Sequence, residues 1–82
     1  MNPHQEIAQF IERMLHQRGD DHPFADADSL IQSGRLESID AVEIVMFLES
    51  RFGLDFAAIG FDQSQIDSVQ LILDLVRTHS SS

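Results

Sequence analysis

The longest amphipathic segment of the chain begins with the run Ser38-Ile39-Asp40-Ala41-Val42-Glu43-Ile44-Val45-Met46-Phe47-Leu48-Glu49. Serine is a favourable residue at a helix start, and Asp40 would fall in the first turn, where a carboxylate stabilises the helix dipole. Gly53 directly follows Phe52 and favours a helix end there. We therefore predict a helix from Ser38 or Ile39 to Arg51 or Phe52, with Ser38 as its cap.

This predicted helix carries more apolar residues than one buried face of ordinary width needs. They are Ile39, Ala41, Val42, Ile44, Val45, Met46, Phe47, Leu48 and Phe52. Some of them must therefore lie on a second surface. We assign Ile44, Val45, Leu48 and Phe52 to the core, and Ile39, Val42 and Met46 to one exposed side of the helix.

Two further segments show helical spacing of apolar residues. The first runs from Pro3 to about Arg18, with Asn2 as a candidate cap, and carries Ile7, Phe10, Ile11, Met14 and Leu15. The last runs from about Asp67 or Ser68 to His79 and carries Val69, Ile72, Leu73 and Val76. Each of these helices would bury one stripe of apolar side chains.

The remaining segments are connections. Residues 19–37 are rich in turn residues and predict a long loop, held over the core by Phe24, Leu30, Ile31 and Leu36. Residues 54–67 predict a connector with one short helix, and residues 80–82 predict a frayed tail. The whole chain, 1–82, is then a single all-α domain with a core over about residues 3–79. It is a bundle of three main helices plus a short helix.

Composition and charge narrow the classes of function. The 82 residues are 43% hydrophobic, and 14 acids against 5 bases give a net charge of -9. This field repels nucleic acid and anionic lipid, and attracts basic patches on proteins. The chain has no cysteine and no apolar run long enough to span a bilayer. We expect a cytoplasmic, monomeric protein with protein partners and without membrane insertion.

The run from Ser38 to Glu49 resembles the Ser-Leu-Asp-x-Val-Glu-Leu-Val-Met-x-Leu-Glu sequence of the acyl carrier protein family. Residues 30–36 and 52–54 resemble the family's preceding loop and its helix exit. The predicted order of three long helices, with a long loop after the first and a short element before the last, is also that of the family, and with it the resemblance covers nearly the whole chain. It implies an acyl-carrier-like fold in which a phosphopantetheinyl transferase attaches 4'-phosphopantetheine from coenzyme A to Ser38. Such a protein is a carrier of acyl thioesters for fatty acid, lipid or polyketide-type biosynthesis, and is not itself an enzyme.

The resemblance also implies a docking face for acyl-transferring or acyl-ligating enzymes that have basic patches. The residues concerned are Glu37, Ile39, Asp40, Val42, Glu43, Met46 and Glu49. An apolar centre with an acidic rim is a suitable surface for such partners. On charge alone, the same acids also fit a solvated helix face. Arg51 departs from the acidic trend.

Two neighbours of Ser38 depart from the family's Asp-Ser-Leu signature: Glu37 replaces the aspartate and Ile39 replaces the leucine. These two departures leave open whether a dedicated transferase is needed to attach phosphopantetheine to Ser38. Two alternatives to an acyl carrier remain: an aminoacyl or peptidyl carrier, and an acidic helical protein-interaction module that is not modified. Asp67-Ser68-Val69 also resembles the signature, but nothing after it matches, so we interpret Ser68 as a helix cap.

Other chemistry finds little support in the sequence. No histidine and acid are placed by a recognisable motif to activate Ser38 as a hydrolase nucleophile. The four histidines show no metal-ligand spacing with carboxylates, so no metal site is predicted.

Overall fold

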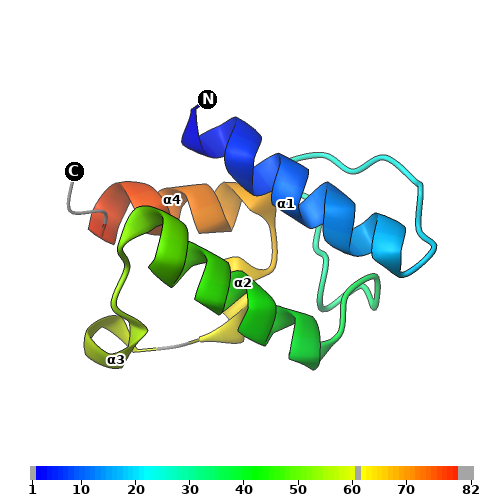
Figure 1. The fold of residues 1–82 in the computed structure, drawn as a ribbon. Helices are drawn as coiled ribbons and strands as arrows, with labels where there is room; N and C mark the ends of the chain where they lie inside the picture. The colour runs from blue at the N-terminus through cyan, green and yellow to red at the C-terminus, as the bar shows by residue number, and fades with distance from the viewer. Residues whose placement is uncertain (1, 61, 80–82) are drawn as a thin grey trace.

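The computed structural model describes residues 2–60 and 62–79, and within these ranges it contains helices and no strand. The elements are α1 (Pro3–Gln17), α2 (Ser38–Phe52), α3 (Phe56–Ile59), the 3-10 helix η1 (Gln63–Ile66) and α4 (Val69–His79), shown in Figure 1. The predicted all-α bundle with three main helices is confirmed. The predicted tail, residues 80–82, lies outside the described residues.

The helices begin and end where the sequence supplies caps. The Asn2 side chain accepts a hydrogen bond from the Gln5 N–H at 2.8 Å, with Pro3 in the first helical position. The Ser68 hydroxyl accepts one from the Leu71 N–H at 3.2 Å. Helix α2 ends at Gly53, whose φ of 72° is a conformation that glycine adopts without strain. Local chemistry therefore fixes most of the boundaries.

The connector between α2 and α4 differs from the prediction of one short helix, because it contains both α3 and η1. Asp55 caps α3 by accepting from the Ala57 N–H at 3.1 Å. Asp62 caps η1 by accepting from the Ser64 N–H at 2.9 Å. Gly60, with φ of 87°, is the C-cap residue of α3. Two separate aspartate caps thus produce two separate turns.

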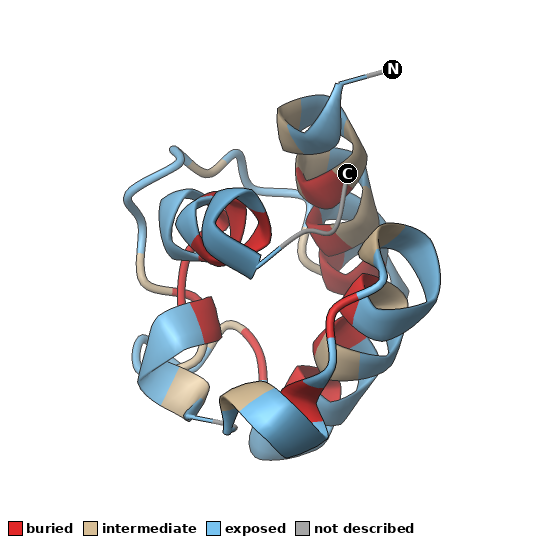
Figure 2. Cartoon of the chain, turned by 90° about the vertical axis from the view of Figure 1, so that its left-hand side faces the viewer, coloured by how far each residue is buried: buried red, intermediate tan, exposed pale blue. Residues whose placement is uncertain are grey.

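The core forms where the apolar faces of the long helices meet, and the buried residues of Figure 2 face this interior. Helix α1 packs on α4, and η1 contacts both α2 and α4. Ile44 and Leu48 of α2 are fully buried, as predicted. Val45 and Phe52 are only half-buried and pack against the edge of the core. Beside them, the rings of Phe10 and Phe47 stack with centroids 4.2 Å apart, which joins α1 to α2.

No helix in residues 2–60 and 62–79 combines the length and apolar character needed to cross a bilayer.

Candidate attachment and docking site on helix α2

Ser38 is the first residue of α2 and is exposed. The capping position belongs instead to Glu37, whose backbone is extended (φ -101°, ψ 169°), so the prediction that Ser38 caps the helix is wrong. The Ser38 hydroxyl makes no hydrogen bond with any residue that the structure describes. Because capping is done by its neighbours, this hydroxyl is available to an external reagent.

Asp40 holds the start of α2 together. One of its carboxylate oxygens, Oδ2, accepts a hydrogen bond from the Glu37 N–H at 2.8 Å and lies 3.1 Å from Nη1 of Arg18. Its side chain is only 12% exposed. We predicted Asp40 on the open docking face, but the capping geometry turns its carboxylate inward. A partner would not reach it without breaking these bonds.

Arg18 also reaches Glu37, on the other side of Ser38, with 3.2 Å between Nη2 and Oε1. Arg18 is the C-cap residue that directly follows α1, so this bridge joins the C-terminus of α1 to the N-terminus of α2. Figure 1 shows these two helix ends on the same side of the molecule. We call the contacts of Arg18 with Glu37 and Asp40 the Arg18 bridge.

The three apolar residues assigned to the second surface of α2 are exposed. Ile39, Val42 and Met46 are 64%, 50% and 62% accessible to solvent. Glu43 lies among them at helical spacing, and its side chain forms no hydrogen bond or ion pair with the described residues. We call Ile39, Val42, Glu43 and Met46 the exposed α2 face. A shallow pocket of about 430 Å³ is lined by Glu43 and Met46 of this face together with Phe10 and Phe47.

Glu49 and Arg51 are committed to contacts at the other end of α2. A Glu49 carboxylate oxygen accepts from the Phe56 N–H at 3.3 Å, at the start of α3. Arg51 pairs with Glu6 of α1, and this ion pair could not be foreseen from residues so far apart in the sequence. Of the four acids that we placed on the docking face, Glu43 alone has no partner among the described residues.

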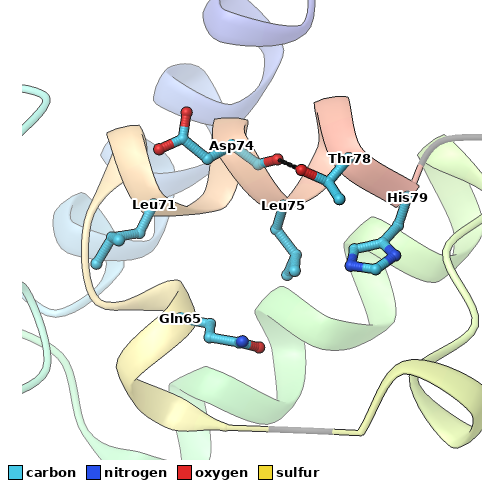
Figure 3. Close-up of a pocket in the computed structure, with 6 residues that line it drawn as sticks. All are labelled: Gln65, Leu71, Asp74, Leu75, Thr78 and His79. Carbon is cyan, nitrogen blue, oxygen red and sulfur yellow. Dashed lines mark hydrogen bonds between the residues drawn. The ribbon is translucent and has the colours of Figure 1, made fainter.

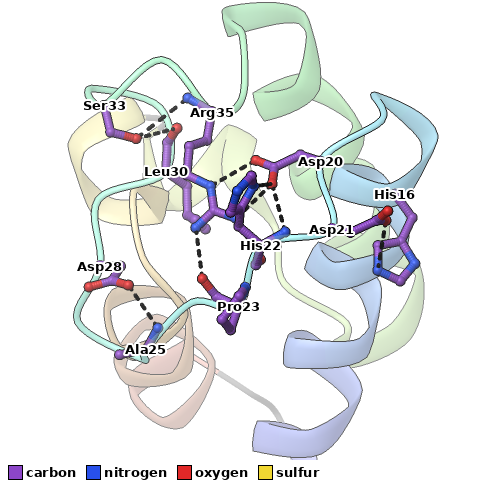
Figure 4. A network of polar contacts seen from close by, with 10 residues as sticks. All are labelled: His16, Asp20, Asp21, His22, Pro23, Ala25, Asp28, Leu30, Ser33 and Arg35. Carbon is purple, nitrogen blue, oxygen red and sulfur yellow. Dashed lines mark hydrogen bonds and ion pairs between the residues drawn. The ribbon is translucent and has the colours of Figure 1, made fainter.

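The loop before Ser38 is fixed at its beginning and end by Arg35 and Asp20. Arg35 donates to both carboxylate oxygens of Asp20, at 2.9 and 3.1 Å, and to the carbonyls of His22 and Pro23 (Figure 4). The pKa of Asp20 lies well below its usual range, mainly because Arg35 donates a hydrogen bond to its carboxylate. Sequence reasoning missed this network, since no motif links the two residues.

Asp67 fixes the same loop to the start of α4. Its Oδ1 accepts from the N–H groups of Ile31 and Gln32 at 2.7 and 3.0 Å, and its carbonyl accepts from the Leu30 N–H at 2.7 Å. Burial tends to raise the pKa of Asp67, but the hydrogen bonds it accepts outweigh burial and lower that pKa. Leu30 and Leu36 are fully buried, as predicted for anchors of this loop.

Ser68, in the Asp67-Ser68-Val69 sequence that also resembles the signature, is unsuited to modification. It is 4% exposed, and its hydroxyl caps α4. The cap interpretation of Ser68 is therefore confirmed.

A second pocket, of about 300 Å³, lies between η1 and α4 and is lined by Gln65, Leu71 and Leu75 among others (Figure 3). It is shallow and open to solvent, whereas Ile44 and Leu48 fill the core itself. Nothing in this arrangement joins the pocket to Ser38.

Three histidines each approach an aspartate: His4 with Asp26 at 2.7 Å, His22 with Asp20 at 3.1 Å and His16 with Asp21 at 3.6 Å. These are separate surface pairs. Across residues 2–60 and 62–79, no three histidine or acidic side chains gather in a way that could hold a metal ion.

Comparison with protein-family models, curated proteins and solved structures found no match for this chain. The functional interpretation therefore depends on the sequence around Ser38 and on the geometry of α2.

Proposed function

We propose that this chain is a cytoplasmic acyl carrier protein whose Ser38 bears 4'-phosphopantetheine. The observation that carries the proposal is the free, exposed hydroxyl of Ser38 at the first residue of α2, directly beside the exposed α2 face. The run from Ser38 to Glu49, which resembles the carrier family, forms this helix. A carrier needs a hydroxyl that a transferase can modify and a nearby apolar surface on which partner enzymes can dock, and this end of α2 has both.

The residues at this position fit the prosthetic group. The Ser38 oxygen would attack the coenzyme A phosphorus that bears pantetheine, the bond from that phosphorus to the adenosine bisphosphate part would break, and the serine proton would pass to a base of the transferase. The first N–H groups of α2 would then face a phosphodiester at the positive end of the helix dipole. The arm supplies a terminal thiol that carries the acyl group as a thioester.

The exposed α2 face supports docking by enzymes with basic patches. Ile39, Val42 and Met46 would be covered on binding, and Glu43 would meet a basic side chain at their edge. A transferase and acyl-transferring or acyl-ligating enzymes would use this face in turn. The net charge of -9 would speed their approach at low salt.

Intact-mass analysis tests the attachment. The purified protein is incubated with coenzyme A and each of several phosphopantetheinyl transferases. Wild type and Ser68→Ala should gain one phosphopantetheine, and Ser38→Ala should gain none. Ser68→Ala also serves as a folding control, because loss of its cap should lower the free energy of unfolding by only about 1 kcal/mol.

Two results would count against this proposal. An adduct on Ser38→Ala would place the attachment elsewhere. If no transferase loads the wild type, the protein is not a carrier, and the exposed α2 face would belong to an unmodified interaction module.

A further inference from the structure

The Arg18 bridge joins the two acids that flank the attachment residue in the sequence. The two nitrogens at the end of the guanidinium hold one carboxylate on each side of Ser38, Glu37 at 3.2 Å and Asp40 at 3.1 Å. The Arg18 side chain is 32% exposed, so the bridge lies at the protein surface. The two acids nearest to the attachment point therefore share one positive charge that comes from α1.

We propose that Arg18 limits how strongly basic partners engage the Ser38 end of α2, a role that deepens the carrier function proposed above and rests on it. A partner's Lys or Arg that approaches Ser38 meets a local charge of -1 instead of -2, because Arg18 neutralises one of the two acids. To pair with Glu37, which is 64% exposed, it must compete with Arg18. To pair with Asp40, it must displace a nearly buried carboxylate from two bonds.

As a consequence, the negative charge available to a partner lies further along α2, at Glu43, and not beside Ser38. Glu43 is the acid of α2 with no partner among the described residues, and it lies five residues beyond Ser38. That spacing corresponds to about 7.5 Å along the helix axis. A transferase suited to this protein would place its basic group opposite Glu43 and would make less use of Glu37. Arg18 is in this sense a residue that sets partner specificity.

The fork of the guanidinium matters as well as its charge. Arginine can hold two carboxylates at once in a fixed plane, whereas a lysine ammonium is a single compact charge on a flexible stem. Arg18→Lys should keep the local charge yet hold Glu37 less firmly. Arg18→Gln removes the charge and should release Glu37 completely, while the bond from the Glu37 N–H to Asp40 can remain.

The first experiment measures kcat and KM for loading of Ser38 by a transferase, at low and at high salt. Arg18→Gln should lower KM by about threefold or more at low salt, with kcat nearly unchanged, and the effect should vanish at high salt. Arg18→Lys should fall between Arg18→Gln and wild type. Arg77→Gln is the matched control, since it removes the same charge from the last turn of α4. It should change KM by much less.

The second experiment does not depend on loading. Apo protein with Ser38→Ala is titrated with a tetralysine peptide, and NMR shifts of the side-chain carboxylates are followed. The peptide should perturb Glu43 with Arg18 present, and should perturb both Glu43 and Glu37 in Arg18→Gln. Circular dichroism verifies that each variant is folded. If Arg18→Gln does not fold, Arg18→Lys and Glu37→Gln take its place.

The outcomes separate this proposal from the carrier function. If wild type is loaded but Arg18→Gln behaves like Arg77→Gln, or if its KM rises, Arg18 only holds the two helices together and the inference is wrong. Equal perturbation of Glu37 with and without Arg18 overturns it as well. If no transferase loads the wild type but the peptide distinguishes the variants as expected, the carrier function fails while the charge-limiting role of Arg18 stands.

Discussion

Individual acids of α2 have different roles although they look alike in the sequence. Asp40 accepts the Glu37 N–H and pairs with Arg18, so its carboxylate is part of the fold. Glu43, less than one turn further, has no partner among the described residues. The resemblance to carriers placed both on one docking face. At the scale of the residue, the contacts of each carboxylate decide whether it supports the fold or a partner.

This difference predicts opposite results for the same charge reversal. Asp40→Lys places a cation beside Arg18 and removes a nearly buried acceptor, so it should lower the free energy of unfolding by about 2 to 3 kcal/mol. Glu43→Lys should change it by less than about 0.5 kcal/mol, yet weaken transferase binding. Urea unfolding and the KM for loading measure the two effects.

The control is Glu12→Lys, which makes the same charge change on the exposed surface of α1. It should alter KM less than Glu43→Lys does. Equal effects of the two variants would mean that only net charge matters, and a fully stable Asp40→Lys variant would contradict the structural role of Asp40.

At the scale of the element, α2 is unusual because it has apolar residues on two faces. Ile44 and Leu48 are buried, whereas Ile39, Val42 and Met46 are exposed on another face. Helices α1 and α4 bury one main stripe each. Since exposed apolar side chains give α2 no burial energy in the free protein, their concentration on one helix favours a binding role.

The loop over residues 18–37 depends on α4 for its shape. Asp67→Ala removes the acceptor of two part-buried hydrogen bonds from the N–H groups of Ile31 and Gln32, so it should lower the free energy of unfolding by about 1 to 2 kcal/mol. Amide hydrogen exchange should speed up at Ile31 and Gln32, and much less in the middle of α2. Asp74→Ala, which removes an exposed acid of α4, is the control. Unchanged exchange at both amides would show that the loop is held by Leu30 and Leu36 instead.

At the scale of the whole molecule, positive charge is scarce and is used to join segments. The five bases are all arginines. Arg18 and Arg51 join α1 to the two ends of α2, and Arg35 closes the loop on Asp20. The 14 acids outnumber these arginines and give the chain its net charge of -9, which favours association with basic proteins.

The lowered pKa values of Asp20, Asp62 and Asp67 predict a loss of stability in acid. A carboxyl whose pKa is lower in the folded state stabilises the fold fully above its unfolded pKa, which is about 3.9 for aspartate. This stabilisation is lost as the pH falls from about 4 toward the folded pKa. Urea unfolding at a series of pH values should show the decline, and Asp67→Ala should show a shallower one. The non-titrating variant Ser38→Ala should follow the wild type, and an identical slope in Asp67→Ala would rule Asp67 out as a contributor.

The sequence by itself determined the helices, because caps, glycine stops and apolar periodicity act between residues close along the chain. Asn2, Pro3, Ser68 and Gly53 set boundaries that the structure reproduces. The division of α2 into buried Ile44 and exposed Ile39 followed from helical geometry alone. The second short element of the connector, η1, escaped prediction because a single aspartate cap, Asp62, is a weak signal.

Only the tertiary structure decided what the charged side chains do. Whether Asp40 faces a partner or the protein depends on Arg18, which α1 brings beside it from 22 residues away in the sequence. Asp67 and Ile31 are 36 residues apart, and Arg51 and Glu6 are 45 apart. Such pairs form only once the core has fixed the helices, because loop closure and burial set these distances and no local pattern encodes them. The sequence located Ser38, and the ion pairs of Arg18 with Glu37 and Asp40 determined the charge around it.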